Sequence, residues 1–274
     1  MAKLIMNINY DALLNSVEEI AREAGAAIYR IYGSEFTVLV KEDHSPLTEA
    51  DCAAHVIIRD ALLRLTPDIP ILSEEDVKSF SKPNDKGQYW LIDPLDGTKE
   101  FVRRNGEFTV NIALVEQGKP TLGVVYAPVL NIFYVAAHGI GAFKRSANLA
   151  RKPIKVQAHV KGRPWRVVGS RSHAGGSLTQ FLKQLGEHEL LSMGSSLKFC
   201  LVAEGRADIY PRFGLTSLWD TAAAQCVLEQ AGGHVVQLDG KPISYANPSA
   251  PLNPFFIAYA SEDPDLIRLA SSFT

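Results

Sequence analysis

The stretch from Phe108 to Phe143 constrains the fold more than any other part of the chain. It contains three apolar runs rich in Val, Ile, Tyr and Phe, separated by short turn segments: NIALV, GVVYAP and IFYVAA, divided by QGKP and VLN. Runs of this length with β-branched and aromatic residues, divided by Gly, Pro and Asn, are typical of strands joined by tight turns. The pattern predicts an antiparallel meander.

Part of this stretch, Thr121 to Phe143, has no Asp, Glu, Lys or Arg and is long enough to span a bilayer. Pro128, Asn131, His138 and three glycines interrupt it. Such polar and helix-breaking residues are costly in lipid, because the bilayer core holds no water to hydrogen-bond the polar groups that they leave unpaired. We therefore expect strands joined at APVLN and no transmembrane segment.

Two helices are predicted before the meander in the sequence. Apolar residues at steps of three and four from Leu13 to Ile31, with Asn9 as N-cap and Gly33 as stop, predict a first helix. A second should run from Thr48 to Leu65, followed by a PILS strand, a loop over 77–88 and a YWLID strand that ends at Pro94.

After a polar crossing at 144–163, strands and helices alternate to the end of the chain. A chain of 274 residues is near the size at which one core divides into two. The prediction is an α+β half over 1–150 and an α/β half over 151–274, packed tightly as one catalytic unit.

The charge balance argues against large anionic partners. The 28 Lys and Arg against 30 Asp and Glu give a net charge of -2, without a basic run for nucleic acid or a membrane surface. Cys52, Cys200 and Cys226 are far apart and form no CxxC, which suits a reducing compartment. The expected location is the cytoplasm, or a peripheral position on the cytoplasmic face of the inner membrane. The sequence does not indicate an oligomeric state.

The segment DPLDGT, Asp93 to Thr98, is the sharpest chemical signal. A strand delivers two carboxylates three residues apart into a glycine turn. The alternative is a simple turn, because Asp, Pro and Gly all favour turns. The full six-residue pattern is rare enough by chance that we favour a functional site.

Further acidic residues could converge on this turn: Glu74, Asp51 and Asp220. Each also has a structural interpretation, since Thr48 with Asp51 and Ser217 with Asp220 match helix capping boxes. A cluster of oxygen ligands without His or Cys selects a hard cation such as Mg2+, and paired ions of this kind serve phosphoryl transfer. The chain has no Walker loop and no HExxH motif, which favours phosphate ester hydrolysis over nucleotide-driven motors or zinc proteolysis.

These motifs carry a family resemblance. The segments SEED, DPLDGTKEF and WDTAAAQCVLEQAGG, in this order, resemble the signature of the inositol monophosphatase superfamily of Mg-dependent, lithium-sensitive phosphatases. Within it, RNGEFTVNIAL, GSRSH and GSSLKFCLVAEGRADIYPRFG resemble the 3'(2'),5'-bisphosphate nucleotidases of the CysQ type. The resemblance implies a layered αβαβα sandwich, which the residue pattern alone does not select.

The resemblance also implies a role for each site residue. Two or three Mg2+ ions would be held by Glu74, Asp93, Asp96, Asp220 and the carbonyl of Leu95. Thr98 paired with Asp51 would take the proton from the attacking water, which Glu74 would help to position. The amides of Gly97 and Thr98 would bind the phosphate that is cleaved, and Asp220 would also face the substrate.

A second phosphate could be bound near the GSSLKFC helix. Lys198 in its first turn is opposed by the helix dipole, a small cost that a bound anion would reverse. Ser195, Ser196 and Arg212 could add donors. From the residues alone, a solvated Lys198 and a strand-end Arg212 are equally good interpretations. The resemblance implies that both hold the phosphate that is not cleaved, and that His173 lies near the nucleoside.

The expected activity is hydrolysis of the 3'-phosphate of adenosine 3',5'-bisphosphate to AMP and phosphate, which would recycle a by-product of sulfur assimilation. One alternative is an inositol or sugar monophosphatase of the same superfamily. A second is a haloacid-dehalogenase type phosphatase, although its two Asp residues are two apart near the N-terminus. A third is a metal-dependent nucleotide sensor, which would have no need of Thr98 and Asp51.

Overall fold

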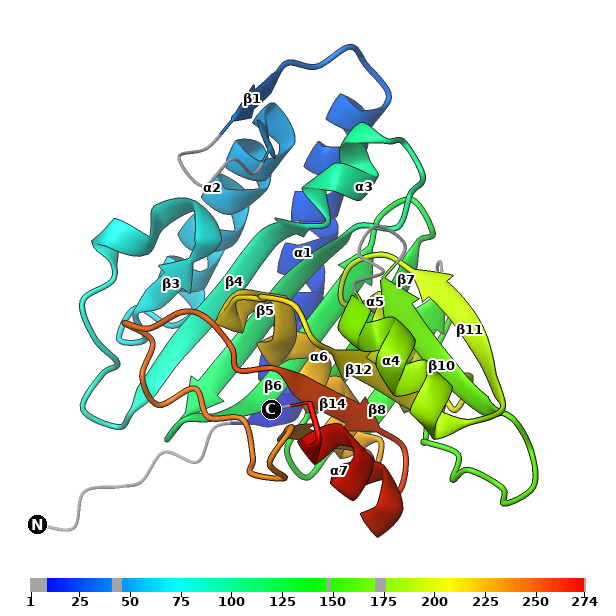
Figure 1. Ribbon diagram of the computed structural model, residues 1–274. Helices are drawn as coiled ribbons and strands as arrows, with labels where there is room; N and C mark the ends of the chain where they lie inside the picture. The colour runs from blue at the N-terminus through cyan, green and yellow to red at the C-terminus, as the bar shows by residue number, and fades with distance from the viewer. Residues whose placement is uncertain (1–8, 41–45, 147–148, 171–175, 274) are drawn as a thin grey trace, which may run out of the picture.

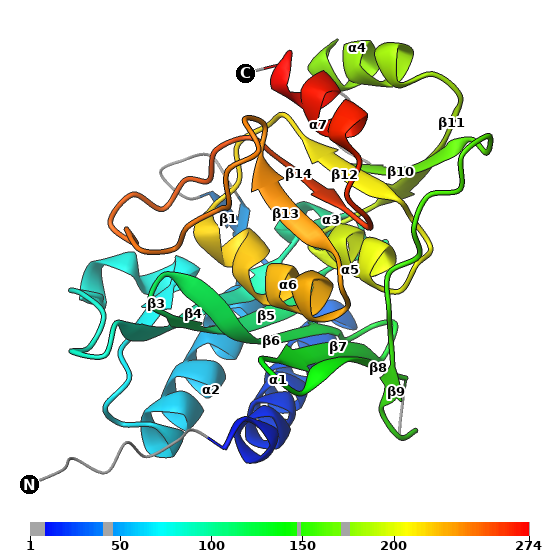
Figure 2. The same cartoon turned by 90° about the horizontal axis from the view of Figure 1, so that it is seen from below.

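The computed structural model describes residues 9–40, 46–146, 149–170 and 176–273. Two sheets and the helices around them form five layers, which are seen edge-on in Figure 2. In order, these layers are α1 with α2, the larger sheet, α5 with α6, the smaller sheet, and α4 with α7. This arrangement confirms the predicted αβαβα sandwich.

The outermost helices are those expected at the N-terminal end. Helix α1 (Tyr10–Tyr32) begins at Asn9, whose side chain accepts a hydrogen bond from the Ala12 amide, and ends at Gly33. Helix α2 (Glu49–Leu65) packs beside it. Both helices lie on one face of the larger sheet, as Figure 1 shows, and their buried apolar residues join those of the sheet in one core cluster. A short hairpin, β1 (Val38–Val40) with β2 (Pro46–Thr48), connects them.

The larger sheet has the strand order β3-β4-β5-β6-β7-β8-β9. Strand β3 (Ile71–Ser73) is parallel to β4 (Gln88–Asp96), and the others form an antiparallel meander: β5 (Thr109–Glu116), β6 (Lys119–Ala127), β7 (Ile132–Ala137), β8 (Gly141–Ser146) and β9 (Lys152–Pro153). The meander prediction is confirmed. Within the described residues, no helix combines the length and hydropathy needed to cross a bilayer.

One strand end differs from expectation. Strand β4 does not stop at Pro94 but continues to Asp96 through a bulge, because Asp93 pairs with Asn111 and Asp96 with Thr109. The neighbouring strand β3 pairs only as far as Ile92, so Pro94 lies beyond it and removes no ladder hydrogen bond on that side. The predicted loop over 77–88 also begins inside the 3-10 helix η1 (Glu74–Ser79).

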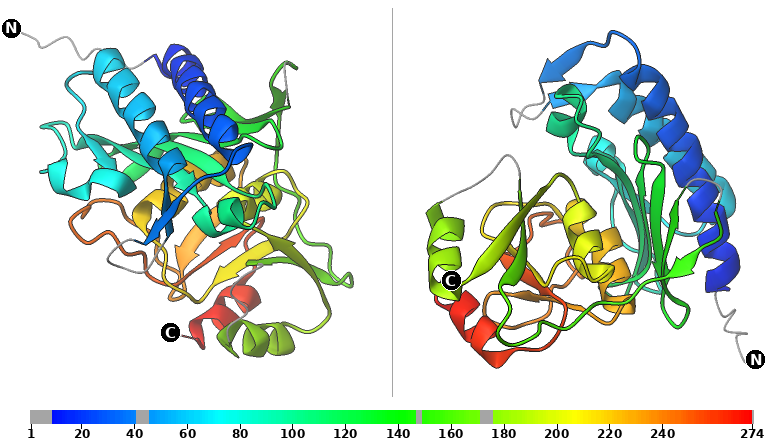
Figure 3. Two further views of the ribbon diagram at one scale, coloured as in Figure 1. Left: turned by 90° about the horizontal axis from the view of Figure 1, so that it is seen from above. Right: turned by 90° about the vertical axis from the view of Figure 1, so that its right-hand side faces the viewer.

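The second half alternates as predicted. Its sheet has the order β11-β10-β12-β14-β13, formed by β10 (Trp165–Ser170), β11 (His188–Met193), β12 (Ile209–Arg212), β13 (His234–Gln237) and β14 (Phe256–Tyr259). Helices α5 (Leu197–Ala203) and α6 (Leu218–Gln230) lie between the two sheets. Helices α4 (Gly176–Leu185) and α7 (Pro264–Ser271) cover the outer face (Figure 3). Strand β11 and helix α7 were not predicted.

Candidate metal centre and active site

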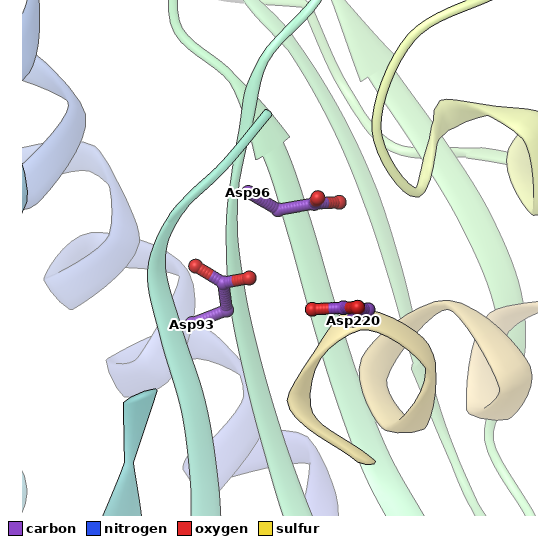
Figure 4. Close-up of side chains that lie close together, drawn as sticks. All are labelled: Asp93, Asp96 and Asp220. Carbon is purple, nitrogen blue, oxygen red and sulfur yellow. The ribbon is translucent and has the colours of Figure 1, made fainter. Parts of the chain in front are cut away.

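Three carboxylates meet where the larger sheet faces the middle helices. Asp93 and Asp96 lie at the end of β4, and Asp220 lies in the first turn of α6. One oxygen from each of the three lies within 4.8 Å of the others. Figure 4 shows these side chains converging from the two elements. The structure thus brings together three of the predicted ligands from segments far apart in sequence.

The bulge in β4 and the turn after it set the directions of these side chains. Asp93 Oδ1 accepts a hydrogen bond from the Leu95 amide at 3.0 Å, across Pro94. Gly97 follows with φ +92°, and a Cβ added there would lie 3.3 Å from Ser195 Cβ. Glycine suits both the left-handed backbone and this close approach. The short helix α3 (Thr98–Val102) then begins, with Gly97 at its N-cap.

The acidic residues at the two helix starts also form the predicted capping boxes. Asp51 Oδ2 accepts from the Thr48 amide at 2.8 Å, and Asp220 Oδ2 accepts from the Ser217 amide at 2.8 Å. Each cap uses one carboxylate oxygen, and the carboxylate still lies at the site. The capping and site interpretations are therefore compatible.

Burial and mutual repulsion raise the proton affinity of the carboxylate cluster. The pKa of Asp93 lies well above its ordinary value because of burial and, next, the negative charges of Glu74, Asp96 and Asp220. The pKa of Asp220 is raised to about 8, first by burial and then by Asp96. Charge neutralisation by a hard divalent cation would relieve this repulsion. The donor set, all carboxylate oxygens, therefore fits Mg2+.

Asp51 and Thr98 lie beside this cluster. Thr98 Oγ1 is 3.4 Å from Asp51 Oδ1 and 3.4 Å from the carbonyl oxygen of Leu95. Burial raises the pKa of Asp51 to about 6, with smaller contributions from Glu75 and Glu74. Glu74 opens η1 directly after β3, and its charge acts on both Asp93 and Asp51. The residues predicted for metal binding and proton transfer in DPLDGT thus form one neighbourhood with Asp51 and Glu74.

A cavity of about 340 Å³ opens beside the carboxylates. Its lining includes most of the predicted substrate residues: Gly97, Thr98, Ser195, Lys198, Arg212 and Asp220. His173 lies outside the described residues. The lining also has apolar surface, which comes from Phe199, Tyr210 and Leu215. This apolar surface was not predicted from the sequence.

Lys198 is not a solvated surface residue. It is only 7% exposed, its ammonium donates to the carbonyl of Ser195, and it lies 5.4 Å from the centre of the Tyr210 ring. Burial lowers its pKa to about 8, against the opposing effect of Asp96. Arg212 lies at the end of β12, where its guanidinium donates to the carbonyls of Gly214 and Leu215 at 3.2 and 2.9 Å. Lys198 and Arg212 therefore both line the cavity that the carboxylates border.

Two features of the site were not predicted from the sequence. The Ser196 amide, expected to be free for a phosphate, donates instead to Asp96 Oδ2 at 2.6 Å. Asn111, on β5, donates to the same oxygen at 3.3 Å. The only signal for Asn111 was a polar residue inside the apolar run TVNIALV.

The sequence matches the inositol monophosphatase family over residues 9–270. Among curated relatives, the 3'(2'),5'-bisphosphate nucleotidase CysQ of Escherichia coli K12 is 54% identical over 246 residues, which covers 89% of this chain and 98% of that protein. The protein of the same name from Buchnera aphidicola is 44% identical over 237 residues, which covers 85% of this chain and 88% of its own.

Solved structures agree with these sequence matches. The crystal structure of CysQ from Bacteroides thetaiotaomicron, described as a bacterial member of the inositol monophosphatase family, superposes with a TM-score of 0.80 at 37% identity. The match covers 94% of this chain and 100% of that one. The extragenic suppressor protein suhB from Bartonella henselae gives a TM-score of 0.78 at 27% identity, over 96% of this chain and 98% of that one. The family resemblance and the fold predicted from it are confirmed.

Proposed function

The chain belongs to the inositol monophosphatase family, and from this premise we propose that its carboxylate cluster hydrolyses the 3'-phosphate of adenosine 3',5'-bisphosphate. The products would be AMP and phosphate, in the recycling of a by-product of sulfur assimilation. The observation that carries the substrate choice is the buried Lys198 in the cavity beside the carboxylates. The relatives named 3'(2'),5'-bisphosphate nucleotidase support the same choice. Family membership also removes the support for a haloacid-dehalogenase type enzyme.

Glu74, Asp93, Asp96, Asp220 and the Leu95 carbonyl are the proposed ligands of two or three Mg2+ ions. Bound Mg2+ would offset the charge of the phosphate and lower the pKa of the attacking water. The carboxylate oxygens within 4.8 Å of one another support a shared cation site. Without a cation, the negative charges of phosphate and carboxylates would repel each other in this buried setting.

Proton movement is assigned to Thr98 and Asp51. The Thr98 hydroxyl would accept a proton from the attacking water while it passes its own proton to Asp51. The separation of 3.4 Å between Thr98 Oγ1 and Asp51 Oδ1 is slightly longer than a strong hydrogen bond and would need to tighten with substrate bound. Glu74 would help to orient the water.

Substrate binding is assigned to the cavity lining. The amides of Gly97 and Thr98 would hold the phosphate that is cleaved. Lys198 and Arg212, supported by Ser195, would hold the 5'-phosphate that remains. A charged group with a depressed pKa regains its proton affinity when an anion binds beside it, so phosphate binding would return the Lys198 pKa toward its ordinary value.

A panel of phosphate esters tests this proposal. Purified protein would be assayed with adenosine 3',5'-bisphosphate, inositol 1-phosphate and fructose 1,6-bisphosphate, with Mg2+ and with a chelator. We expect the adenosine bisphosphate to have the highest kcat/KM, and hydrolysis to require Mg2+. Preference for either other substrate would favour an inositol or sugar monophosphatase. Nucleotide binding without turnover would favour a sensor. The cytoplasmic location and any membrane association stay predictions.

A further inference from the structure

Strand β5 carries two buried polar side chains that the proposed mechanism does not use. Thr109 and Asn111 are 0% and 1% exposed, and they share their face of the strand with the apolar Ala113 and Val115. Burying an amide in an apolar layer is unfavourable unless both its ends are hydrogen-bonded. The contacts of Asn111 therefore indicate why a polar residue is present.

Both ends of the Asn111 side chain are paired. Its Oδ1 accepts from Ser196 Oγ at 2.8 Å and from Thr109 Oγ1 at 3.0 Å. Its Nδ2 donates to Asp96 Oδ2 at 3.3 Å. A carboxylate can only accept and a hydroxyl can donate, so these contacts place Oδ1 toward the two hydroxyls and Nδ2 toward the carboxylate.

Asp96 is held by these contacts in one orientation. Its Oδ2 receives two hydrogen bonds, from Asn111 Nδ2 and from the Ser196 amide at 2.6 Å. With Oδ2 occupied in this way, Oδ1 is the oxygen left for a cation. Hydrogen bonds that orient a ligating carboxylate in this manner strengthen metal binding.

The side-chain amide of Asn111 also contacts the turn that precedes Lys198, through Ser196. Ser196 precedes Lys198 by two residues, and its hydroxyl and amide both enter this network. The turn is packed closely: Gly194 donates to Glu107 Oε2 at 2.8 Å, and a Cβ at Gly194 would lie 2.7 Å from the Glu107 carbonyl oxygen. The cation site and the cationic side of the cavity are therefore one connected unit.

We propose that Asn111 is a positioning residue that orients Asp96 for cation binding and joins it to the Ser196–Lys198 turn. This inference rests on the proposed function, because it assumes that the carboxylate cluster binds Mg2+. Asn111 is not among the residues that line the cavity, and its effect would pass through Asp96.

The test is direct measurement of Mg2+ binding by calorimetry in Asn111→Leu, which keeps the side-chain size and removes both hydrogen-bonding ends. We expect Mg2+ to bind about 10- to 100-fold more weakly. At low Mg2+ the kcat should fall, and high Mg2+ should restore most of it. Because Mg2+ would also stabilise the folded state by mass action, a destabilised control variant is needed.

Gln88→Leu is the matched control. Gln88 has a buried side-chain amide and lies at the other end of β4 from Asp96. Its Nε2 donates to Glu116 Oε1 at 2.6 Å. Its replacement removes a similar amide from the same sheet, so the melting temperature should fall while Mg2+ affinity stays the same. Equal weakening of Mg2+ binding in both variants would overturn the proposal, as would unchanged affinity in a folded Asn111→Leu.

Ser196→Ala is a milder test of the same hydrogen-bond network if Asn111→Leu does not fold. It removes one hydroxyl from Asn111 Oδ1 and retains the backbone bond to Asp96, so Mg2+ affinity should fall by about 2- to 10-fold. Unchanged affinity in that variant would also overturn the proposal. Mg2+ binding that depends on Asn111, in a protein that hydrolyses no phosphate ester, would support the positioning role and overturn the proposed function.

Discussion

At the scale of single residues, the site uses helix starts to hold acidic side chains. Asp51 and Asp220 each complete a capping box through Oδ2 at the beginning of α2 and α6. The positive end of the helix dipole favours a carboxylate there. One residue thus stabilises a helix and presents charge to the site, so a capping motif in a sequence does not exclude a functional role.

The Asp51 pKa predicts how activity depends on pH. Asp51 must be ionised to accept a proton from Thr98, and burial raises its pKa to about 6. The kcat should therefore fall as the pH drops through about 6, or through a lower value if bound Mg2+ offsets the charge of Glu74. The measurement is kcat against pH at saturating Mg2+ and substrate.

Asp51→Asn is the control for this assignment. It removes the titrating group and keeps the side-chain size, so the remaining activity should be low and should lack the acidic limb of the profile. An acidic limb that persists unchanged in Asp51→Asn would contradict the role of Asp51.

Lys198 should determine the preference for a second phosphate. A charge-assisted contact contributes about 1.5 to 3 kcal/mol, so Lys198→Ala should lower kcat/KM for adenosine 3',5'-bisphosphate by about 10- to 100-fold. Adenosine 3'-phosphate has no second phosphate to lose, so its kcat/KM should change little. The informative quantity is the ratio of the two kcat/KM values.

Lys99 provides a matched comparison, since it also lines the cavity but is exposed. Lys99→Ala should leave the substrate ratio near that of the wild type. If Lys198→Ala has the same ratio as Lys99→Ala, the 5'-phosphate is held elsewhere.

At the scale of elements, α6 lies unusually close to the larger sheet. A Cβ added at Gly123 on β6 would lie 2.2 Å from the carbonyl oxygen of Ala223 in α6. Gly123→Ala must therefore push the helix and the strand apart, which should lower the free energy of unfolding by about 1 to 3 kcal/mol. Because α6 carries Asp220, Mg2+ affinity should also fall.

Chemical denaturation and Mg2+ titration of Gly123→Ala measure both effects. Gly176→Ala is the control, because a Cβ at Gly176 would meet nothing within 4 Å. Full stability in Gly123→Ala would mean that the helix tolerates displacement, contrary to our expectation.

The elements that the sequence predicted well are those whose pattern is local. The first two helices have clear caps and apolar periodicity, and the meander has turns between apolar runs. The end of β4 was predicted wrongly, because whether Pro94 interrupts a strand depends on how far the neighbouring β3 extends. Strand β11 was missed because it is an edge strand with largely exposed residues and little alternation.

The site residues likewise divide into those that a local sequence pattern predicts and those whose contacts depend on distant segments. Asp93, Asp96 and Asp220 were found from motif and resemblance, while the burial of Lys198 and the network at Asn111 depend on packing between distant segments. No local sequence pattern predicts that an Asn in β5 will form a hydrogen bond with Ser196. A polar residue inside an otherwise apolar strand is the one signal that could have directed attention to it.

At the scale of the whole molecule, the site lies where the layers meet. Asp93 and Asp96 belong to the larger sheet, while Lys198 and Asp220 belong to the helices between the sheets. The proposed cation site is thus assembled only when these layers pack together. A cation that binds only the packed state stabilises it by mass action.

Mg2+ should therefore raise the melting temperature, and more so at higher pH. Without a cation, burial and repulsion raise the pKa of Asp93 and bring that of Asp220 to about 8, so the folded state binds more protons than the unfolded state. Stability should then fall as pH rises from the unfolded pKa of about 4 toward 8. Mg2+ at 100 times its Kd would add about 2.7 kcal/mol.

Scanning calorimetry with and without Mg2+, near pH 5.5 and pH 8, checks this expectation. Asp93→Asn should reduce both the Mg2+ effect and the fall in stability with pH, because it removes one of the repelling charges. A stabilisation by Mg2+ that is equal at the two pH values would contradict the electrostatic account.

We propose that this carboxylate site removes the 3'-phosphate and keeps the 5'-phosphate of its substrate. The most direct measurement is identification of the nucleotide product by chromatography and phosphorus NMR after incubation of adenosine 3',5'-bisphosphate with the protein and Mg2+. We expect adenosine 5'-phosphate with equimolar phosphate, and no product with Asp93→Asn. Formation of adenosine 3'-phosphate, or product formation that persists in Asp93→Asn or without divalent cations, would contradict this proposal.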